Sequence, residues 1–364
     1  MMIGVPKEVK SHEYRVSVMP VGVELLIKAG HRVIVEAGAG VGSGYRDEEY
    51  TAAGAEVVAE AGGASDVWGQ ADMVVKVKEP QSEEWALMKQ GQVVFTYFHF
   101  AASRELTKAC LEAGITAVAY ETLAVGGKLP LLTPMSEVAG RMAVLEGGKS
   151  LQKPQMGRGI LLSGVPGVEP AKVTVLGGGI VGANAAKVAA GLGANVVIMD
   201  VSLDRLRELD AVMPANVRTI YSEPHAIRWH VTHSDLVIGA VLIPGGRCPT
   251  LIPREMLKDM RDGAVIVDVG VDQGGCVETS RPTSHEAPTY VVDGVVHYCV
   301  SNMPGAVGRT STQALCHATQ PYVLKLAGSD LSSVFETDAA LGSALNIRDG
   351  QITHAGVAAA YDGA

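Results

Sequence analysis

Three glycines in the middle of the chain have the spacing of a phosphate-binding turn. Gly177, Gly179 and Gly182 lie in the segment VTVLGGGIVG, which begins as an apolar, strand-like run and opens a helix of small residues. In such a turn the first glycine permits the tight bend, the second lets the backbone approach a pyrophosphate, and the third allows close helix–strand packing. Free N–H groups at the helix N-terminus favour a bound anion. The motif therefore predicts a dinucleotide site.

Asp200 ends the next strand-like run, about 20 residues beyond the turn, where ribose recognition requires an acidic residue. Its carboxylate can accept hydrogen bonds from ribose hydroxyls and repels a 2′-phosphate, which favours NAD over NADP. Nearby Arg205 weakens that preference. A structural glycine turn with a solvated Asp200 is the alternative. Residues 35–45 also contain glycines after a strand, but Ser43 occupies the third motif position, so we interpret them as a loop.

Cations and a histidine occur earlier in the chain, beside apolar runs. Lys76 and Lys78 are two residues apart in MVVKVK, so on a strand both would point to one face, either as ligand cations or as guards of an edge strand. Alternatively, Arg15 is a solvent-exposed arginine and His99 is a buried histidine with a structural role. Asp272 follows another strand-like run, and the carboxyl ends of parallel strands face the ligand crevice. Together, these residue types can hold a carboxylate and move a proton.

Strand-like and helical segments alternate on both sides of the glycine motif. This alternation predicts an α/β fold with two doubly wound, Rossmann-like domains, each with a parallel sheet, separated by a cleft. Residues 136–304 are expected to form the NAD-binding domain, entered by a helix with Ser136 as its N-cap. A helix beginning near Ser311 is expected to pack back onto the first domain. The predicted substrate domain is therefore discontinuous, with residues 1–135 plus 305–364.

The composition limits the class of protein. Of 364 residues, 47% are hydrophobic and 5% aromatic, which suits Val- and Ala-rich strands, and no apolar stretch is long enough to predict a membrane span. The formal net charge of −9 argues against a nucleic-acid partner. Five scattered cysteines without a CxxC pair predict reduced thiols, and no clustered metal ligands occur. With no signal-peptide pattern at the start, we expect a cytoplasmic protein.

An ordered set of short motifs extends these observations to most of the chain. They are MIGVPKE with Arg15, KVKEP, HFAAS, TPMSEVAGR, GVPGVEP, GGGIVG, VDQGG and SNMPGAV, and together they resemble the alanine dehydrogenase family. The resemblance runs from Met2 to about Lys325. Several of the motifs are shared with the NAD-binding subunit of proton-translocating transhydrogenases. One departure from the family pattern is Gly178, where alanine is usual.

The resemblance implies NAD-dependent interconversion of L-alanine and water with pyruvate, ammonium and NADH. Carried over by position, Arg15 and Lys78 would contact the substrate, His99 would act as acid and base, and Asp272 would support catalysis. A homo-oligomer, specifically a hexamer, is also implied. The residues implied to line the nucleotide site are Ser136, Gly177, Gly179, Ile180, Val181, Gly182, Asp200, Arg205, Ser222, Val241, Leu242, Val269, Asp272, Val300, Asn302 and Met303.

Three other functions stay open on the sequence alone. The chain could be the NAD-binding component of a membrane transhydrogenase, another NAD-linked opine or 2-hydroxy-acid dehydrogenase, or a NAD-sensing module without catalysis. The joint presence of Arg15, Lys78 and His99 favours a pocket for a small molecule. Oxidation of NADH that requires ammonium as well as pyruvate would separate the amino-acid reaction from a lactate-type reaction.

Overall fold

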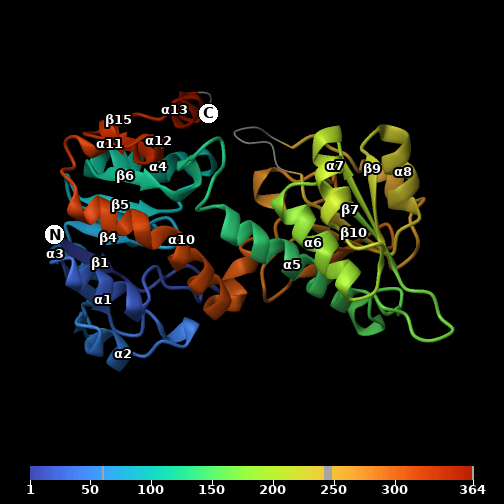
Figure 1. Cartoon of the computed structure of the whole chain (residues 1–364), viewed down its shortest axis with the longest axis horizontal. Helices are drawn as coiled ribbons and strands as arrows, with labels where there is room; N and C mark the ends of the chain where they lie inside the picture. Colours follow the sequence, from blue (N-terminus) through green and yellow to red (C-terminus); the bar gives the residue numbers. More distant parts are fainter. Residues whose placement is uncertain (60, 242–247, 363–364) are drawn as a thin grey trace. The chain divides into compact units, whose positions relative to one another are not determined.

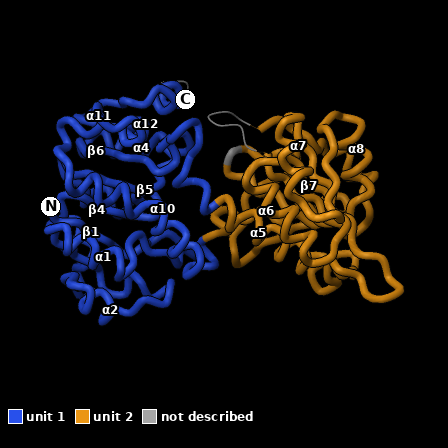
Figure 2. Tube along the Cα trace, viewed as in Figure 1, with its two compact units in different colours: residues 1–135, 305–364 blue, residues 136–304 orange. Residues whose placement is uncertain are grey.

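The computed structural model describes residues 1–59, 61–241 and 248–362. The chain forms two compact units, within each of which the residues contact one another extensively (Figure 2). They are residues 1–135 with 305–364 and residues 136–304. Each unit is built on a mainly parallel sheet with helices packed on it (Figure 1). The expected α/β architecture is confirmed. No helix in the described part of the chain combines the length and apolar character needed to cross a membrane.

The first unit has a doubly wound sheet. Its strands are β1 (Met2–Val5), β2 (Arg32–Glu36), β3 (Glu56–Val58), β4 (Met73–Val75), β5 (Val93–Thr96), β6 (Thr116–Ala119), β14 (Leu345–Arg348) and β15 (Gln351–Ile352). They are ordered β3-β2-β1-β4-β5-β6-β14-β15, and the pairs from β3 to β6 are parallel. The chain thus winds from β1 to one side and from β4 to the other, as in dinucleotide-binding folds.

Helices of the first unit cover this sheet. They are α1 (Pro20–Lys28), α2 (Asp47–Ala52), α3 (Gly63–Gln70), α4 (Arg104–Ala113), α10 (Gly308–Gly328), α11 (Val334–Thr337), α12 (Ala339–Ala344) and α13 (Ala355–Asp362). The C-terminal helix α10 is tied to the segment after Arg15. The Val16 N–H donates to Thr312 Oγ1 at 3.0 Å, and Cys316 Sγ lies 3.2 Å from the Ser17 carbonyl. The late part of the chain therefore helps to hold the segment that follows Arg15.

The second unit repeats the same winding. Its strands are β7 (Lys172–Leu176), β8 (Asn195–Asp200), β9 (Val217–Tyr221), β10 (Leu236–Gly239), β11 (Val265–Asp268), β12 (Thr289–Val292) and β13 (Val295–Tyr298), in the order β9-β8-β7-β10-β11-β13-β12. Its helices are α6 (Ile180–Gly191), α7 (Leu203–Val212), α8 (Pro224–Thr232) and α9 (Arg254–Leu257), and α5 (Thr133–Ser150) leads into it. Every residue of β10 and β11 is buried, as expected for parallel strands covered on both faces.

One local prediction is wrong. Ser136 is not the N-cap of α5, because the helix already begins at Thr133 and Pro134 occupies its first turn, where a missing N–H costs nothing. At the edge of the second sheet, β12 lies outside β13 and pairs antiparallel with it. The connecting Asp293 and Gly294 both have positive φ angles, and such an Asp-Gly turn is a hairpin signal that the sequence carried.

Candidate active site

Candidate residues of the first unit follow neighbouring strands of its sheet. Arg15 comes after β1, Lys78 after β4 and His99 after β5, and these strands are parallel neighbours. The winding direction reverses between β1 and β4. Doubly wound sheets bind ligands at the carboxyl ends of the strands that flank such a switch point. The topology therefore brings the three segments to the edge of the sheet where a ligand is expected.

Arg15 is buried and held in one orientation by Glu13. Its Nε and Nη2 atoms donate to the two Glu13 carboxylate oxygens at 2.6 and 2.5 Å, and its Nη1 atom lies 3.0 Å from the sulfur of Met135. Burial by itself would lower the pKa of Arg15, but the Glu13 carboxylate outweighs burial and raises the pKa. The guanidinium therefore stays charged, and its planar fork is fixed before any carboxylate ligand arrives.

Lys78 is half-buried beside Arg15. Burial lowers the pKa of Lys78, and the charges of Arg15 and Lys10 lower it further, while Glu79 and Glu13 oppose the shift. This coupling shows that the ammonium lies in the field of the guanidinium. Lys10 is itself paired with Glu79 at 2.5 Å, and Arg15 is paired with Glu13. Lys78 places a further ammonium at this edge of the sheet, and a cationic group of this kind suits an anionic substrate.

His99 lies in a left-handed backbone conformation, with a φ of 52°. The Glu121 carboxylate accepts from the His99 N–H at 2.5 Å and from the Phe98 N–H at 3.1 Å, which holds this unusual bend. The half-buried imidazole stacks on the Tyr97 ring, with 5.8 Å between centroids and 9° between planes. Burial raises the pKa of Tyr97, and the charge of Arg15 partly opposes that rise. Tyr97, which supports the His99 ring, is therefore also within the electrostatic influence of Arg15.

The sequence reasoning missed the side chains that hold this cluster in place. Glu13 orients Arg15, Glu121 fixes the backbone of His99, and Tyr97 supports its ring. Glu121 had a detectable signal, because it follows the strand-like run TAVAY at the same edge of the sheet as the other candidates. Glu13 had a weaker signal, an acidic residue two positions before an arginine.

Lys76 and Lys78 do not share an environment. Strand β4 ends at Val75, so both lysines lie beyond it and the alternation of a strand does not apply. The interpretation of the pair as guards of an edge strand is wrong, because β4 lies between β1 and β5. Lys76 is fully buried, whereas Lys78 is half-buried beside Arg15. Only the second lysine of the pair belongs to the cluster.

The glycine motif lies at the switch point of the second sheet, between β7 and α6. Gly177 has a φ of +97°, which a side chain would strain, and a Cβ atom there would lie 2.7 Å from the Ala240 carbonyl oxygen. A Cβ atom at Gly182 would lie only 1.8 Å from the Gly177 carbonyl oxygen. At Gly179 no atom of the described residues lies within 4 Å of that position. The middle glycine thus leaves open space at the helix N-terminus, as an approaching phosphate requires.

Asp200 is bound to the glycine turn. Its Oδ2 atom accepts from the Gly178 N–H at 2.7 Å, and its Oδ1 atom accepts from the Ser202 N–H at 2.8 Å. Arg205 Nε donates to the Gly178 carbonyl at 2.7 Å, and its Nη1 atom pairs with Glu208 at 2.8 Å. Gly178, the residue that departs from the family pattern, is therefore bonded to both Asp200 and Arg205. A Cβ atom added at Gly178 would lie 3.0 Å from Asp200 Oδ2.

The other predicted nucleotide residues lie at the carboxyl edge of the second sheet or in helices beside it. Ser222 donates its N–H to the Asp200 carbonyl at 2.9 Å, and Val269 donates its N–H to the Gly239 carbonyl at 2.9 Å. Ser301 Oγ donates to Asp272 Oδ1 at 2.5 Å, which joins the loops after β11 and β13. Ile180 and Val181 are in the first turn of α6, Val241 follows β10, Val300, Asn302 and Met303 follow β13, and Ser136 is within α5. Leu242 lies outside the described residues.

The chain is similar to known proteins over nearly its whole length. Residues 4–139 match the family described as "Alanine dehydrogenase/PNT, N-terminal domain", and residues 143–355 match "Alanine dehydrogenase/PNT, C-terminal domain". An alanine dehydrogenase of Halomonas elongata is 54% identical over 362 residues, covering 99% of this chain and 97% of that protein.

Solved structures of an alanine dehydrogenase and of a transhydrogenase are both similar to this chain. An L-alanine dehydrogenase structure is 51% identical with a TM-score of 0.95, covering 100% of this chain and 99% of that chain. A transhydrogenase structure from Sinorhizobium meliloti is 26% identical with a TM-score of 0.82, covering 98% of this chain and 99% of that chain. Both share the fold, and the sequence is far more similar to the first.

Proposed function

This chain belongs to the alanine dehydrogenase/PNT family, and we propose that it converts L-alanine, NAD⁺ and water into pyruvate, ammonium, NADH and a proton, and catalyses the reverse reaction. The observation that carries the proposal is the placement of Arg15, Lys78 and His99 after neighbouring parallel strands at one edge of a sheet, in a chain 54% identical to a protein named alanine dehydrogenase. A transhydrogenase component is not favoured, because the transhydrogenase structure is only 26% identical.

Residues of the second unit fit NAD as the coenzyme. The open position at Gly179, at the N-terminus of α6, supports binding of a pyrophosphate. The Asp200 carboxylate is suited to ribose hydroxyls and repels a 2′-phosphate. The bound coenzyme supplies the acceptor for the hydride that leaves Cα of alanine. Titration of the protein with NADH and NADPH, followed by their fluorescence, tests this preference; tighter binding of NADPH would contradict it.

Each residue of the first unit has a role that follows from its chemistry. Arg15, already oriented by Glu13, holds the substrate carboxylate. Lys78 stabilises negative charge on the carbonyl oxygen of pyruvate and on the oxygen of the carbinolamine formed from it. His99 transfers the protons as water adds to the iminium carbon and ammonia leaves. The family resemblance also implies a supporting role in catalysis for Asp272, whose carboxylate could orient the water or balance the cations.

One absorbance assay tests the reaction. NADH is expected to form when L-alanine and NAD⁺ are supplied, and to be consumed when pyruvate and ammonium are supplied together. Consumption with pyruvate alone would indicate a 2-hydroxy-acid dehydrogenase. Silence with alanine, lactate, lysine and pyruvate would favour a binding module or a transhydrogenase component over the proposed reaction.

The proposal extends to assembly and location. We expect a homohexamer, from the family resemblance, and a cytoplasmic location, which suits the buried, reduced state of all five cysteines. Light scattering of the purified protein tests the first expectation, and cell fractionation tests the second.

A further inference from the structure

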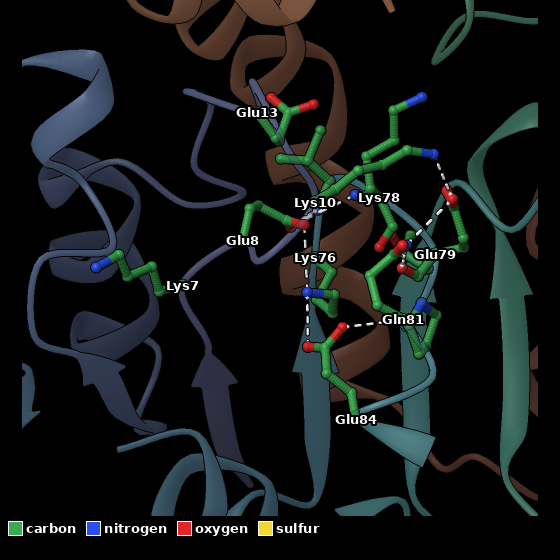
Figure 3. Close-up of polar contacts among 12 residues, drawn as sticks. Lys7, Glu8, Lys10, Glu13, Lys76, Lys78, Glu79, Gln81 and Glu84 are labelled. Atoms are coloured by element: carbon green, nitrogen blue, oxygen red, sulfur yellow. Dashed lines mark hydrogen bonds and ion pairs between the residues drawn. The ribbon is translucent and has the colours of Figure 1, made fainter. Parts of the chain in front are cut away.

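The ammonium of Lys76 lies at the centre of a buried group of three charges (Figure 3). Its Nζ atom is 3.2 Å from Glu8 Oε2 and 2.9 Å from Glu84 Oε1, and the three side chains are at most 4% exposed. Burial by itself would lower the pKa of Lys76, but the two carboxylates outweigh it, raise the pKa and keep the group charged. The proposed reaction assigns no role to any of these residues.

Such a group is a poor device for stability alone. Taking an ion out of water costs several kcal/mol even in a relaxed protein, and well-packed apolar residues often replace a buried ion pair without loss. A buried group of charges instead constrains the geometry of whatever its members bind. The contacts on the far side of each carboxylate therefore indicate what this group holds in place.

Glu8 connects the buried ammonium to the backbone of Lys78. While Oε2 pairs with Lys76, Oε1 accepts from the Val77 N–H at 2.6 Å and lies 3.4 Å from the Lys78 nitrogen. From the other side, Thr96 Oγ1 donates to the Lys78 carbonyl at 2.9 Å. The peptide groups on both sides of the Lys78 Cα atom are therefore held, although β4 has already ended.

Glu84 binds a different part of the chain. Its Oε2 atom accepts from the Gln81 N–H at 2.8 Å, and its own N–H donates to the Gln81 carbonyl at 2.8 Å. These bonds close the turn at residues 81–84 (Figure 3). The two carboxylates of the buried group thus bind Lys76 in the same way, but only Glu8 contacts the Lys78 backbone.

We propose that Glu8 is a positioning residue for Lys78, and that the buried charge of Lys76 holds Glu8 in place for that purpose. The inference rests on the proposed function, because it assumes that Lys78 acts on the substrate. Lys78 requires such support because Arg15 and Lys10 repel its ammonium, and a flexible four-carbon side chain relaxes toward water unless its base is fixed.

The variants Glu8→Gln and Glu84→Gln form a matched pair. Each replaces one carboxylate of the same buried group by an amide of equal size, so both are expected to lower the melting temperature. Only Glu8→Gln is expected to raise KM for pyruvate and lower kcat/KM, by about 10- to 100-fold, because small displacements of a reacting group are costly. KM for NADH is expected to stay unchanged in both, and Glu84→Gln should keep the pyruvate KM of the unmodified protein.

Amide hydrogen exchange gives a readout that does not depend on turnover. Exchange in a peptide covering residues 76–79 should become faster in Glu8→Gln and stay slow in Glu84→Gln. Equal changes in the two variants, or none in either, would overturn the proposal. If the unmodified protein converts neither alanine nor pyruvate, the proposed function fails. In that case exchange still decides whether Glu8 holds this backbone.

Discussion

Glu13 and Arg15 form a two-pronged ion pair in which both side chains are almost completely excluded from solvent, at 0% and 2% exposure. Each carboxylate oxygen accepts a hydrogen bond from the guanidinium, one from Nε and one from Nη2. The arginine that holds the substrate carboxylate in the proposed reaction is therefore oriented by the protein itself. Binding then costs little ordering of this side chain, which is the advantage of a preorganised site.

Glu13→Gln is expected to reduce both stability and substrate binding. The amide leaves a buried guanidinium without its counter-charge, and breaking such a pair costs about 3–5 kcal/mol. Urea unfolding followed by circular dichroism measures the loss, and steady-state kinetics should give a higher KM for pyruvate. Glu56→Gln is the control, because its pair with Arg32 is exposed and should contribute little. Equal losses in the two variants would contradict the prediction.

Substrate binding is expected to weaken at alkaline pH through Lys78. Burial lowers the pKa of Lys78 below its ordinary value of 10.5, so its charge is lost at a lower pH than for a solvated lysine. Oxamate, an unreactive isostere of pyruvate, should therefore bind tightly below this lowered pKa and more weakly above it. Fluorescence of bound NADH can report oxamate binding without ammonium present. The variant Lys78→Met should bind weakly and lack the step; an identical pH profile would refute the assignment.

The variant His99→Asn removes the imidazole and is compatible with the same backbone conformation. Asparagine tolerates the left-handed conformation found at a φ of 52°, so the bond from the backbone N–H to Glu121 can persist. Turnover with alanine is expected to fall by about 10²- to 10⁴-fold, the range for a lost general acid–base group. Thermal unfolding and NADH binding should change little. Near-normal turnover in this folded variant would remove His99 from the mechanism.

Alanine substitutions at two glycines of the motif should affect different properties: stability at Gly182 and NADH binding at Gly179. Gly182→Ala places a Cβ atom 1.8 Å from the Gly177 carbonyl oxygen, so it is expected to destabilise the second unit by about 1–3 kcal/mol. Gly179→Ala meets no atom within 4 Å in the described part of the chain, so it should unfold like the unmodified protein while binding NADH more weakly. Thermal unfolding and fluorescence titration measure the two effects. Unweakened NADH binding in Gly179→Ala would place the pyrophosphate elsewhere.

Local patterns in the sequence were sufficient for the architecture. Short Val- and Ile-rich runs alternating with helical patterns predicted two parallel α/β sheets, because strands buried on both faces are apolar throughout. The spacing of the glycines predicted the tight turn before α6, and the structure shows that turn bonded to Asp200. The start of one helix was predicted wrongly: α5 begins at Thr133 rather than after Ser136, because a proline in the first turn is compatible with a helix.

The sequence by itself determined the kinds of side chain present and the strands that they follow, since both depend on residues close together in the chain. Only the tertiary structure decided which of them act together. Lys76 and Lys78 look alike in the motif KVKEP, yet Lys76 pairs with Glu8 and Glu84 while Lys78 lies in the field of Arg15. Charge pairing acts through space between segments that the sheet order brings together, so no local periodicity can report it.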